Sequence, residues 1–142
     1  MSLEENKKLV ADFFNAMKMA DLETLDKITT DDFAFKPMIG EGGLKKEAML
    51  KMIGGVLDAF SDHTNRIDDI VAEGDKVSVR MTVTGVHTGQ WGKFAPTGKL
   101  FKIAECFFLR IEDGKIAEYM GIKDALGQYQ QLGILPPNEE IG

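Results

Sequence analysis

The sequence has a single cysteine, Cys106, among its 142 residues. One thiol cannot form a disulfide within the chain, so the fold must be held by packing alone, which suits a reducing compartment. We expect Cys106 to be a small core residue. The two histidines, His63 and His87, are far apart in sequence and have no cysteine near them, so the spacing of a zinc site is missing. The sequence therefore predicts neither a metal nor a cofactor.

An excess of basic residues is also missing. Seventeen lysines and arginines face 23 aspartates and glutamates, which gives a formal net charge of -6. This balance argues against a nucleic-acid partner, which requires clustered Lys and Arg, and against an anionic membrane surface. No apolar run approaches the length that spans a bilayer, and the first eight residues are charged rather than typical of a signal peptide. We expect a cytoplasmic protein.

Repeats, linkers and low-complexity segments are absent as well. A chain of this length can bury about 68–70% of the surface that it exposes when unfolded, enough for one core without covalent staples. Its 44% hydrophobic and 28% charged residues are ordinary for a globular protein. We therefore predict a single domain over residues 1–142.

The first 60 residues have the apolar spacing of helices. Ser2 and Glu5 have the spacing of a capping box and predict that a helix begins there. Asp21 predicts the start of a second, short helix, and residues 33–37 are typical of a short strand. A third helix is expected over residues 44–60. It contains Gly54-Gly55, which close packing on the sheet would explain, with a break in the helix as the alternative.

From residue 64 the apolar residues alternate instead. This period predicts strands over 67–71, 76–87, 99–111 and 115–122, with hairpin turns at Gly74 and Gly114. A last helix is expected from Asp124 to Leu132. Helices followed by an antiparallel meander indicate an α+β fold. A strongly curved sheet wrapped around the N-terminal helices would form a cone with an interior pocket.

The order and spacing of several short segments indicate a family. They are residues 67–77 and the junctions His87-Thr88-Gly89 and Pro96-Thr97-Gly98-Lys99, followed by residues 111–116 and Gln131-Leu132-Gly133. Together they resemble the SnoaL-like polyketide cyclase family of the NTF2-like superfamily. The resemblance implies a deep pocket between a long helix and a concave sheet, and a homodimer paired through the sheet surface. It also implies ring closure in a polyketide ester by an aldol reaction that needs no metal or cofactor and uses a pocket carboxylate.

The last predicted strand departs from that pattern. The cyclases typically read Lys-Ile-x-Glu-His-Trp-Asp there, with the His and the Asp facing the pocket. Here residues 115–121 read Lys-Ile-Ala-Glu-Tyr-Met-Gly. Tyr119 therefore stands at the histidine position and Gly121 at the position of the carboxylate. Orthodox cyclase chemistry would need another acid or base.

Glu105 is the leading candidate for that acid or base. It lies inside an apolar run and, by strict alternation, shares a face with Phe101, Ile103 and Phe107. If that face is concave, the carboxyl group points into an apolar pocket, where desolvation raises its pKa as general acid/base catalysis requires. The alternative is a shift in register that places Glu105 at a solvent-exposed or dimer face.

Tyr119 and His87 are the other candidate catalytic residues. Tyr119 could donate a hydrogen bond to a developing enolate oxygen, or it could be a wall residue with its hydroxyl at the rim. His87 could be a pocket acid or base, or a residue at a strand end that bonds to the backbone. We expect His63 to be a surface or capping group.

The pocket wall is expected to be apolar, with methionines that let it adapt to a flat ligand. The candidate binding residues are Phe14, Met17, Phe35, Met38, Trp91, Phe101, Ile103 and Phe107, which could equally be core residues. Trp91, in the long connection after residue 87, is the best candidate for a lid.

The leading functional prediction is acid/base chemistry, without a cofactor, on a small hydrophobic carbonyl compound, of the cyclase or isomerase type. Glu105 would be the base and Tyr119 the donor to the oxyanion. Two alternatives remain open at this point: a protein that binds a small hydrophobic molecule without converting it, and a dimeric interaction module of the same fold.

Overall fold

The computed structural model describes residues 1–141, beginning with helix α1 (Leu3–Lys18). The capping box is confirmed, because the Ser2 hydroxyl accepts a hydrogen bond from the Glu5 amide at 3.1 Å and the Glu5 carboxylate accepts one from the Ser2 amide at 3.2 Å. The box thereby satisfies two backbone amides at the start of the helix, those of Ser2 and Glu5, which have no partner within the helix. One face of α1 is buried, and it carries Val10, Phe13 and Phe14 towards the sheet.

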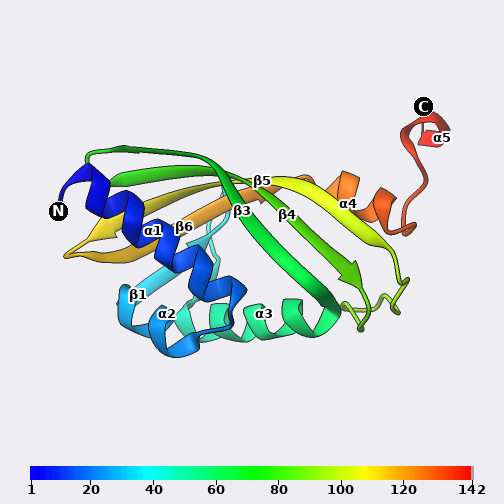
Figure 1. Ribbon diagram of the computed structural model, residues 1–142, viewed down its shortest axis with the longest axis horizontal. Helices are drawn as coiled ribbons and strands as arrows, with labels where there is room; N and C mark the ends of the chain where they lie inside the picture. The colour runs from blue at the N-terminus through cyan, green and yellow to red at the C-terminus, as the bar shows by residue number, and fades with distance from the viewer. Residues whose placement is uncertain (142) are drawn as a thin grey trace.

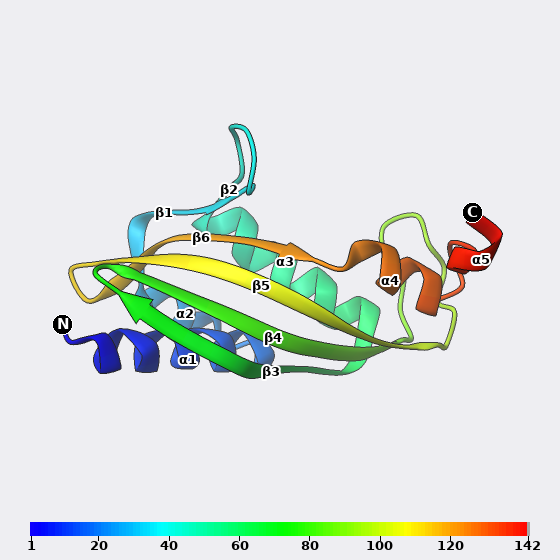
Figure 2. The same ribbon diagram turned by 90° about the horizontal axis from the view of Figure 1, so that it is seen from above.

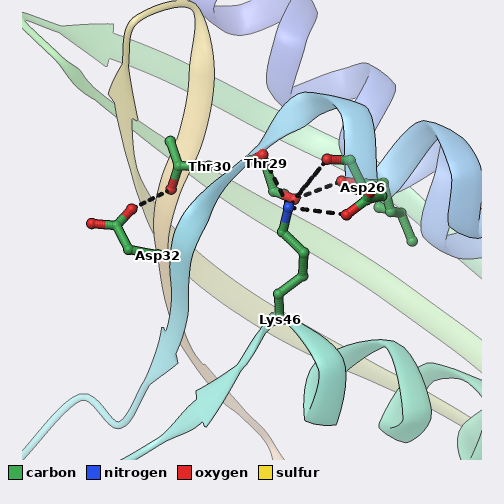
Figure 3. A network of polar contacts seen from close by, with 6 residues as sticks. Asp26, Thr29, Thr30, Asp32 and Lys46 are labelled. Carbon is green, nitrogen blue, oxygen red and sulfur yellow. Dashed lines mark hydrogen bonds and ion pairs between the residues drawn. The ribbon is translucent and has the colours of Figure 1, made fainter.

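Helix α2 (Leu22–Ile28) and helix α3 (Lys46–Ala59) are joined by one lysine side chain. Lys46, the first residue of α3, donates to the carbonyl oxygens of Asp26 and Thr29 at 3.2 and 3.3 Å and to the Asp26 carboxylate at 3.1 Å (Figure 3). These carbonyls lie at the C-terminal end of α2, where a helix dipole favours a positive charge. The contact fixes the start of α3 relative to α2.

Six strands form one sheet in the order β2-β1-β6-β5-β4-β3. Their bounds are β1 (Thr29–Lys36), β2 (Leu44–Lys45), β3 (Phe60–Glu73), β4 (Lys76–His87), β5 (Leu100–Glu112) and β6 (Lys115–Lys123). The four long strands form the expected antiparallel meander, but β1 lies parallel to β6. The predicted antiparallel sheet is thus confirmed for the meander and wrong for this one pair.

The long strands curve over the three N-terminal helices, all of which lie on one side of the sheet (Figures 1 and 2). Alternation is strict in the two central long strands: in β4 every second residue from Val77 to His87 is buried, and in β5 Phe101, Ile103, Phe107 and Leu109 are buried. The predicted α+β cone is confirmed.

Helix α4 (Ala125–Gln131) follows β6, and Asp124 caps it by accepting a hydrogen bond from the Gly127 amide at 2.8 Å. Helix α5 (Asn138–Ile141) ends the described chain.

Some local expectations need correction. Strand β3 begins at Phe60 rather than near residue 67, and Cys106 is exposed on the outer face of the sheet instead of buried in the core. The reason for the second error is that Glu105 takes the inward position, so its neighbour must point outward. None of the helices within residues 1–141 combines the length and the apolar character needed to cross a bilayer.

The glycine pair in α3 has neither of the expected explanations. The helix continues through Gly54 and Gly55 without a break, and a Cβ added at either position would meet no atom within 4 Å. Both residues face open space on an exposed part of the helix. Nothing in the packing of the described residues requires glycine here.

Replacing both glycines by alanine should therefore stabilise the protein. Alanine restricts the unfolded chain and has the higher helix propensity, so each of Gly54→Ala and Gly55→Ala should raise the free energy of unfolding by about 0.4–1 kcal/mol. Urea denaturation measures this. Gly85→Ala is the matched control and should destabilise, because its Cβ would lie 2.9 Å from the Phe101 ring. Loss of stability in the α3 variants would contradict the prediction.

Candidate active site

A cavity of about 360 Å³ lies between the concave face of the sheet and helices α1 and α3. Its wall is mostly apolar and includes side chains from α1, α3, β1 and the four long strands. The volume is at the lower end of the range for small-molecule sites, which combine apolar walls with a few polar groups. The polar groups here come from α1, β3, β5 and β6.

Glu105 is one of these groups, as the alternation of β5 predicts. It is half-buried and faces the cavity beside Phe107, and its carboxyl group makes no hydrogen bond or ion pair with any residue in 1–141. Burial raises the pKa of its carboxyl group, while the nearby charge of Lys123 acts in the opposite direction. A carboxyl group that is desolvated and has no protein partner is suited to exchange a proton with a ligand.

Tyr119 is buried, at 3% exposure, and its side chain also lines the cavity. Its ring stacks on Phe107 with 4.8 Å between ring centroids and an interplanar angle of 17°, and it lies 4.7 Å from the Phe35 ring. Burial raises the pKa of its phenol well above the usual value, and Glu105 raises it further. The phenol is therefore neutral at physiological pH and able to donate a hydrogen bond.

Gly121, at the position where the resemblance to the cyclases implies a carboxylate, lies next to this stack. A Cβ built on Gly121 would overlap the Phe107 ring, which is its cross-strand partner in the β5–β6 pairing. The aromatic ring thus fills the space that a side chain at position 121 would need. Glycine at this position and phenylalanine at 107 are matched to each other.

Sequence reasoning missed four polar groups of the cavity: Lys18, His63, Asn65 and Lys123. Lys18 ends helix α1, where no signal marked it. The other three were missed because the predicted strands were too short: β3 was expected to begin after His63 and Asn65, and β6 to end before Lys123. The period of two along a strand could have found them: His63 and Asn65 lie on the same face as Ile67, and Lys123 lies on the same face as Tyr119. Burial lowers the pKa of His63, and the Lys123 charge lowers it further, so the imidazole is neutral.

His87 does not line the cavity, so the first of its two predicted roles, a pocket acid or base, is wrong, and it has the position of the second, a residue at a strand end that bonds to the backbone. It is fully buried at the end of β4, and its Nδ1 accepts a hydrogen bond from the Thr97 amide at 3.3 Å. Its ring lies 5.3 Å from that of Phe60 and 6.2 Å from that of Trp91. These contacts place it in a second aromatic cluster, at the end of the sheet near the loop 88–99.

The predicted wall residues divide evenly. Phe14, Met17, Phe35 and Phe107 line the cavity. Phe101 and Ile103 face the same side of the sheet but are buried core residues, and Met38 lies 40% exposed in the loop after β1.

Trp91, the candidate lid, does not line the cavity either: it stacks on Tyr129 at 5.5 Å and lies under the Lys123 ammonium, which is 5.2 Å from the ring centroid. Its contacts are those of a packed residue, not of a free lid.

Within residues 1–141, no three His, Cys, Asp or Glu side chains come together in a way that could hold a metal ion. The polar groups of the cavity are instead one carboxyl, one phenol, one imidazole, one amide and two lysines, Lys18 and Lys123. This set is suited to proton transfer and hydrogen bonding in an apolar enclosure.

Comparison with known proteins gives a consistent match. The family model of the SnoaL-like polyketide cyclases matches residues 8–132. Over 90 residues the chain is 33% identical to the aklanonic acid methyl ester cyclase AcmA of Streptomyces galilaeus, a match that covers 62% of each protein. Over 96 residues it is 29% identical to the nogalonic acid methyl ester cyclase of Streptomyces nogalater, covering 66% of this chain and 71% of that one.

Solved structures extend the likeness to nearly the whole chain. AclR of Streptomyces galilaeus, a proposed hydroxylase, superposes with a TM-score of 0.86 at 29% identity and covers 99% of this chain and 89% of its own. IdmH of Streptomyces antibioticus, a proposed polyketide cyclase, gives a TM-score of 0.79 at 27% identity over 90% of this chain and 98% of its own.

The matched pair Gly121 and Phe107 can be tested by substitution. Gly121→Asp should lower the free energy of unfolding by about 1–3 kcal/mol, because the new side chain overlaps the Phe107 ring. In the double variant with Phe107→Ala, the cost should be less than the sum of the two single costs by at least about 0.5 kcal/mol. Urea denaturation of the four proteins of this cycle gives the coupling. Strict additivity would show that the two positions do not interact.

Proposed function

Because this chain belongs to the SnoaL-like polyketide cyclase family, we propose that it binds a small hydrophobic carbonyl compound in the cavity and converts it by acid/base chemistry without a metal or cofactor. The observation that carries the proposal is Glu105, a carboxyl group with a raised pKa that faces an apolar cavity and has no protein partner in residues 1–141. The cyclase names of the relatives support a polyketide as the substrate class.

In the proposed reaction, the Glu105 carboxylate removes a proton from the carbon next to a carbonyl group of the substrate. The electron pair left on that carbon forms an enolate, whose oxygen receives a hydrogen bond from the neutral phenol of Tyr119. The enolate carbon attacks a second carbonyl group in the same molecule, which closes a ring with a new carbon–carbon bond. Protonated Glu105 then returns its proton to the new alkoxide, so the enzyme ends as it began.

The surrounding wall supports this assignment of roles. The rings of Phe14, Phe107 and Tyr119 form a continuous series, with centroid distances of 5.2 Å and 4.8 Å between successive rings. A flat substrate can stack on such a surface and be held in the orientation that ring closure needs. His87 has no part in the proposed reaction, because it lies outside the cavity.

Replacing Glu105 by glutamine tests the proposed base. Gln keeps the size of the side chain but cannot accept the proton, so Glu105→Gln should lower the turnover rate about a hundred- to ten-thousand-fold while ligand affinity changes little. Mass spectrometry of a panel of polyketide esters and ketosteroids incubated with protein detects conversion. Glu73→Gln, an exposed acid on β3 away from the cavity, is the control and should keep full activity.

The dependence of turnover on pH gives an independent check. The base works only when deprotonated, and burial raises its pKa, so kcat/KM should fall on the acidic side at a pH above the 4.5 of an ordinary glutamate. Binding without conversion across the panel would contradict the enzymatic proposal and favour a carrier. Full turnover by Glu105→Gln would leave the cavity as the site but remove Glu105 as its base.

We further propose that two copies of the chain pair through the outer face of the sheet. On that face, Phe108 is 48% exposed and Ile122 is 62% exposed, and they lie beside Cys106 and Met120 in the β5–β6 pairing. An exposed apolar patch on a rigid sheet is a common feature of protein–protein contacts. Pairing there would leave the helical side and the cavity free.

A charge placed in this patch should prevent pairing. Phe108→Lys should halve the mass measured by analytical ultracentrifugation, because two desolvated ammonium groups would face each other across the interface. Leu22→Lys is the matched control, since Leu22 is 45% exposed on α2, on the other side of the sheet, and should keep the dimer mass. A wild-type protein with the mass of one chain would overturn this proposal.

A further inference from the structure

The charges around the cavity differ in sign from those of the whole chain. The protein carries a formal net charge of -6, yet the cavity is lined by two lysines, Lys18 and Lys123, and by only one acidic residue, Glu105. The remaining titratable groups of the wall, His63 and Tyr119, are both neutral because burial disfavours their charged forms. The cavity is therefore positive inside an acidic protein, and a charged ligand that complements it is an anion.

Lys123 has the geometry of a group that binds a ligand. It ends β6 directly across from Glu105, with which it forms a cross-strand pair, so both side chains project from the concave face next to each other. Even so, no ion pair joins them within 4.0 Å, and Lys123 has no salt bridge to any acid in residues 1–141. Its ammonium group instead lies 5.2 Å from the centroid of the Trp91 ring.

This position leaves the lysine charge without a full counterion. A contact with an aromatic face stabilises a cation less than a charge-assisted hydrogen bond to a carboxylate does. Lys123 is an exposed residue, and the desolvated part of its side chain against the wall lowers its pKa. A ligand carboxylate would supply the counterion.

We propose that the ligand of this cavity is a hydrophobic compound with a free carboxylate, which Lys123 binds while the aromatic wall holds the rings. The inference rests on the proposed use of this cavity as the ligand site. It goes further, because it assigns to this chain a free acid, whereas the names of the relatives give methyl esters.

Binding of such a ligand would also act on the base. The charge of Lys123 is the one influence that lowers the pKa of Glu105. A carboxylate bound to Lys123 neutralises that charge, so the proton affinity of Glu105 increases when the ligand arrives. The lysine would then couple recognition of the acid to the strength of the base on the neighbouring strand.

A matched pair of ligands tests the proposal. Isothermal titration calorimetry at pH 7 compares 2-naphthoic acid with its methyl ester, which share the ring and differ in charge. The wild-type protein should bind the acid about tenfold more tightly than the ester, the effect of one charge-assisted hydrogen bond. Lys123→Met should lose this preference and Lys123→Arg should keep it. Lys51→Met, an exposed lysine of α3 that does not line the cavity, is the control and should behave as the wild type.

The chain's single tryptophan provides a second readout. When Lys123 leaves the Trp91 ring for the carboxylate, the indole N–H signal in a nitrogen–proton correlation spectrum should shift with the acid and not with the ester.

Equal affinity for acid and ester, or a preference that survives Lys123→Met, would overturn the inference while leaving the cavity as the ligand site. A preference lost in Lys18→Met and kept in Lys123→Met would overturn the assignment to Lys123. Failure of both ligands to bind would count against the inference and against the proposed site together, whereas Glu105→Gln turnover tests the base alone.

Discussion

The register between β5 and β6 is the constraint on which the site depends. Three alternate cross-strand pairs lie on the concave face: Leu109 with Tyr119, Phe107 with Gly121, and Glu105 with Lys123. All of these residues except Leu109 line the cavity. Because side chains alternate along each strand, a shift of one residue in this pairing would turn the whole set to the outer face. The aromatic stack, the glycine that makes room for it and the polar pair beyond it are therefore fixed by a single alignment of backbone hydrogen bonds.

This arrangement places a polar pair at a point where burial is costly. Glu105 and Lys123 each shift towards the neutral form, because the apolar wall disfavours both charges. Each also favours the charged form of the other, so the two effects oppose one another within the pair. A site that holds two such groups without closing them into a salt bridge gives up stability and keeps both available for a ligand.

The packing of the helices explains why the fold has an interior. Helix α1 covers the sheet with large rings, among them Phe13 and Phe14, whose ring centroids are 5.3 Å apart. Helix α3 approaches the other part of the concave face with Met49 and Ile53 buried and Met52 and Val56 bordering the cavity. The cavity is the space left between these helices and the concave face of the sheet. Lys46 and its bonds to the end of α2 hold this geometry at one end.

The sequence by itself determined the elements, the meander and the face on which Glu105 lies, because these follow from local caps, turns and the period of two along a strand. The resemblance to the cyclases also placed Gly121 at the position where that family is expected to have a carboxylate. The tertiary structure decided what lies near what: that His87 is packed against Phe60 outside the cavity, that His63 and Lys123 reach into it, and that Phe107 occupies the space beside Gly121. The reason is physical: alternation assigns a side chain to a face, whereas its neighbours depend on strand ends, pairing register and curvature, which arise only when distant segments pack together.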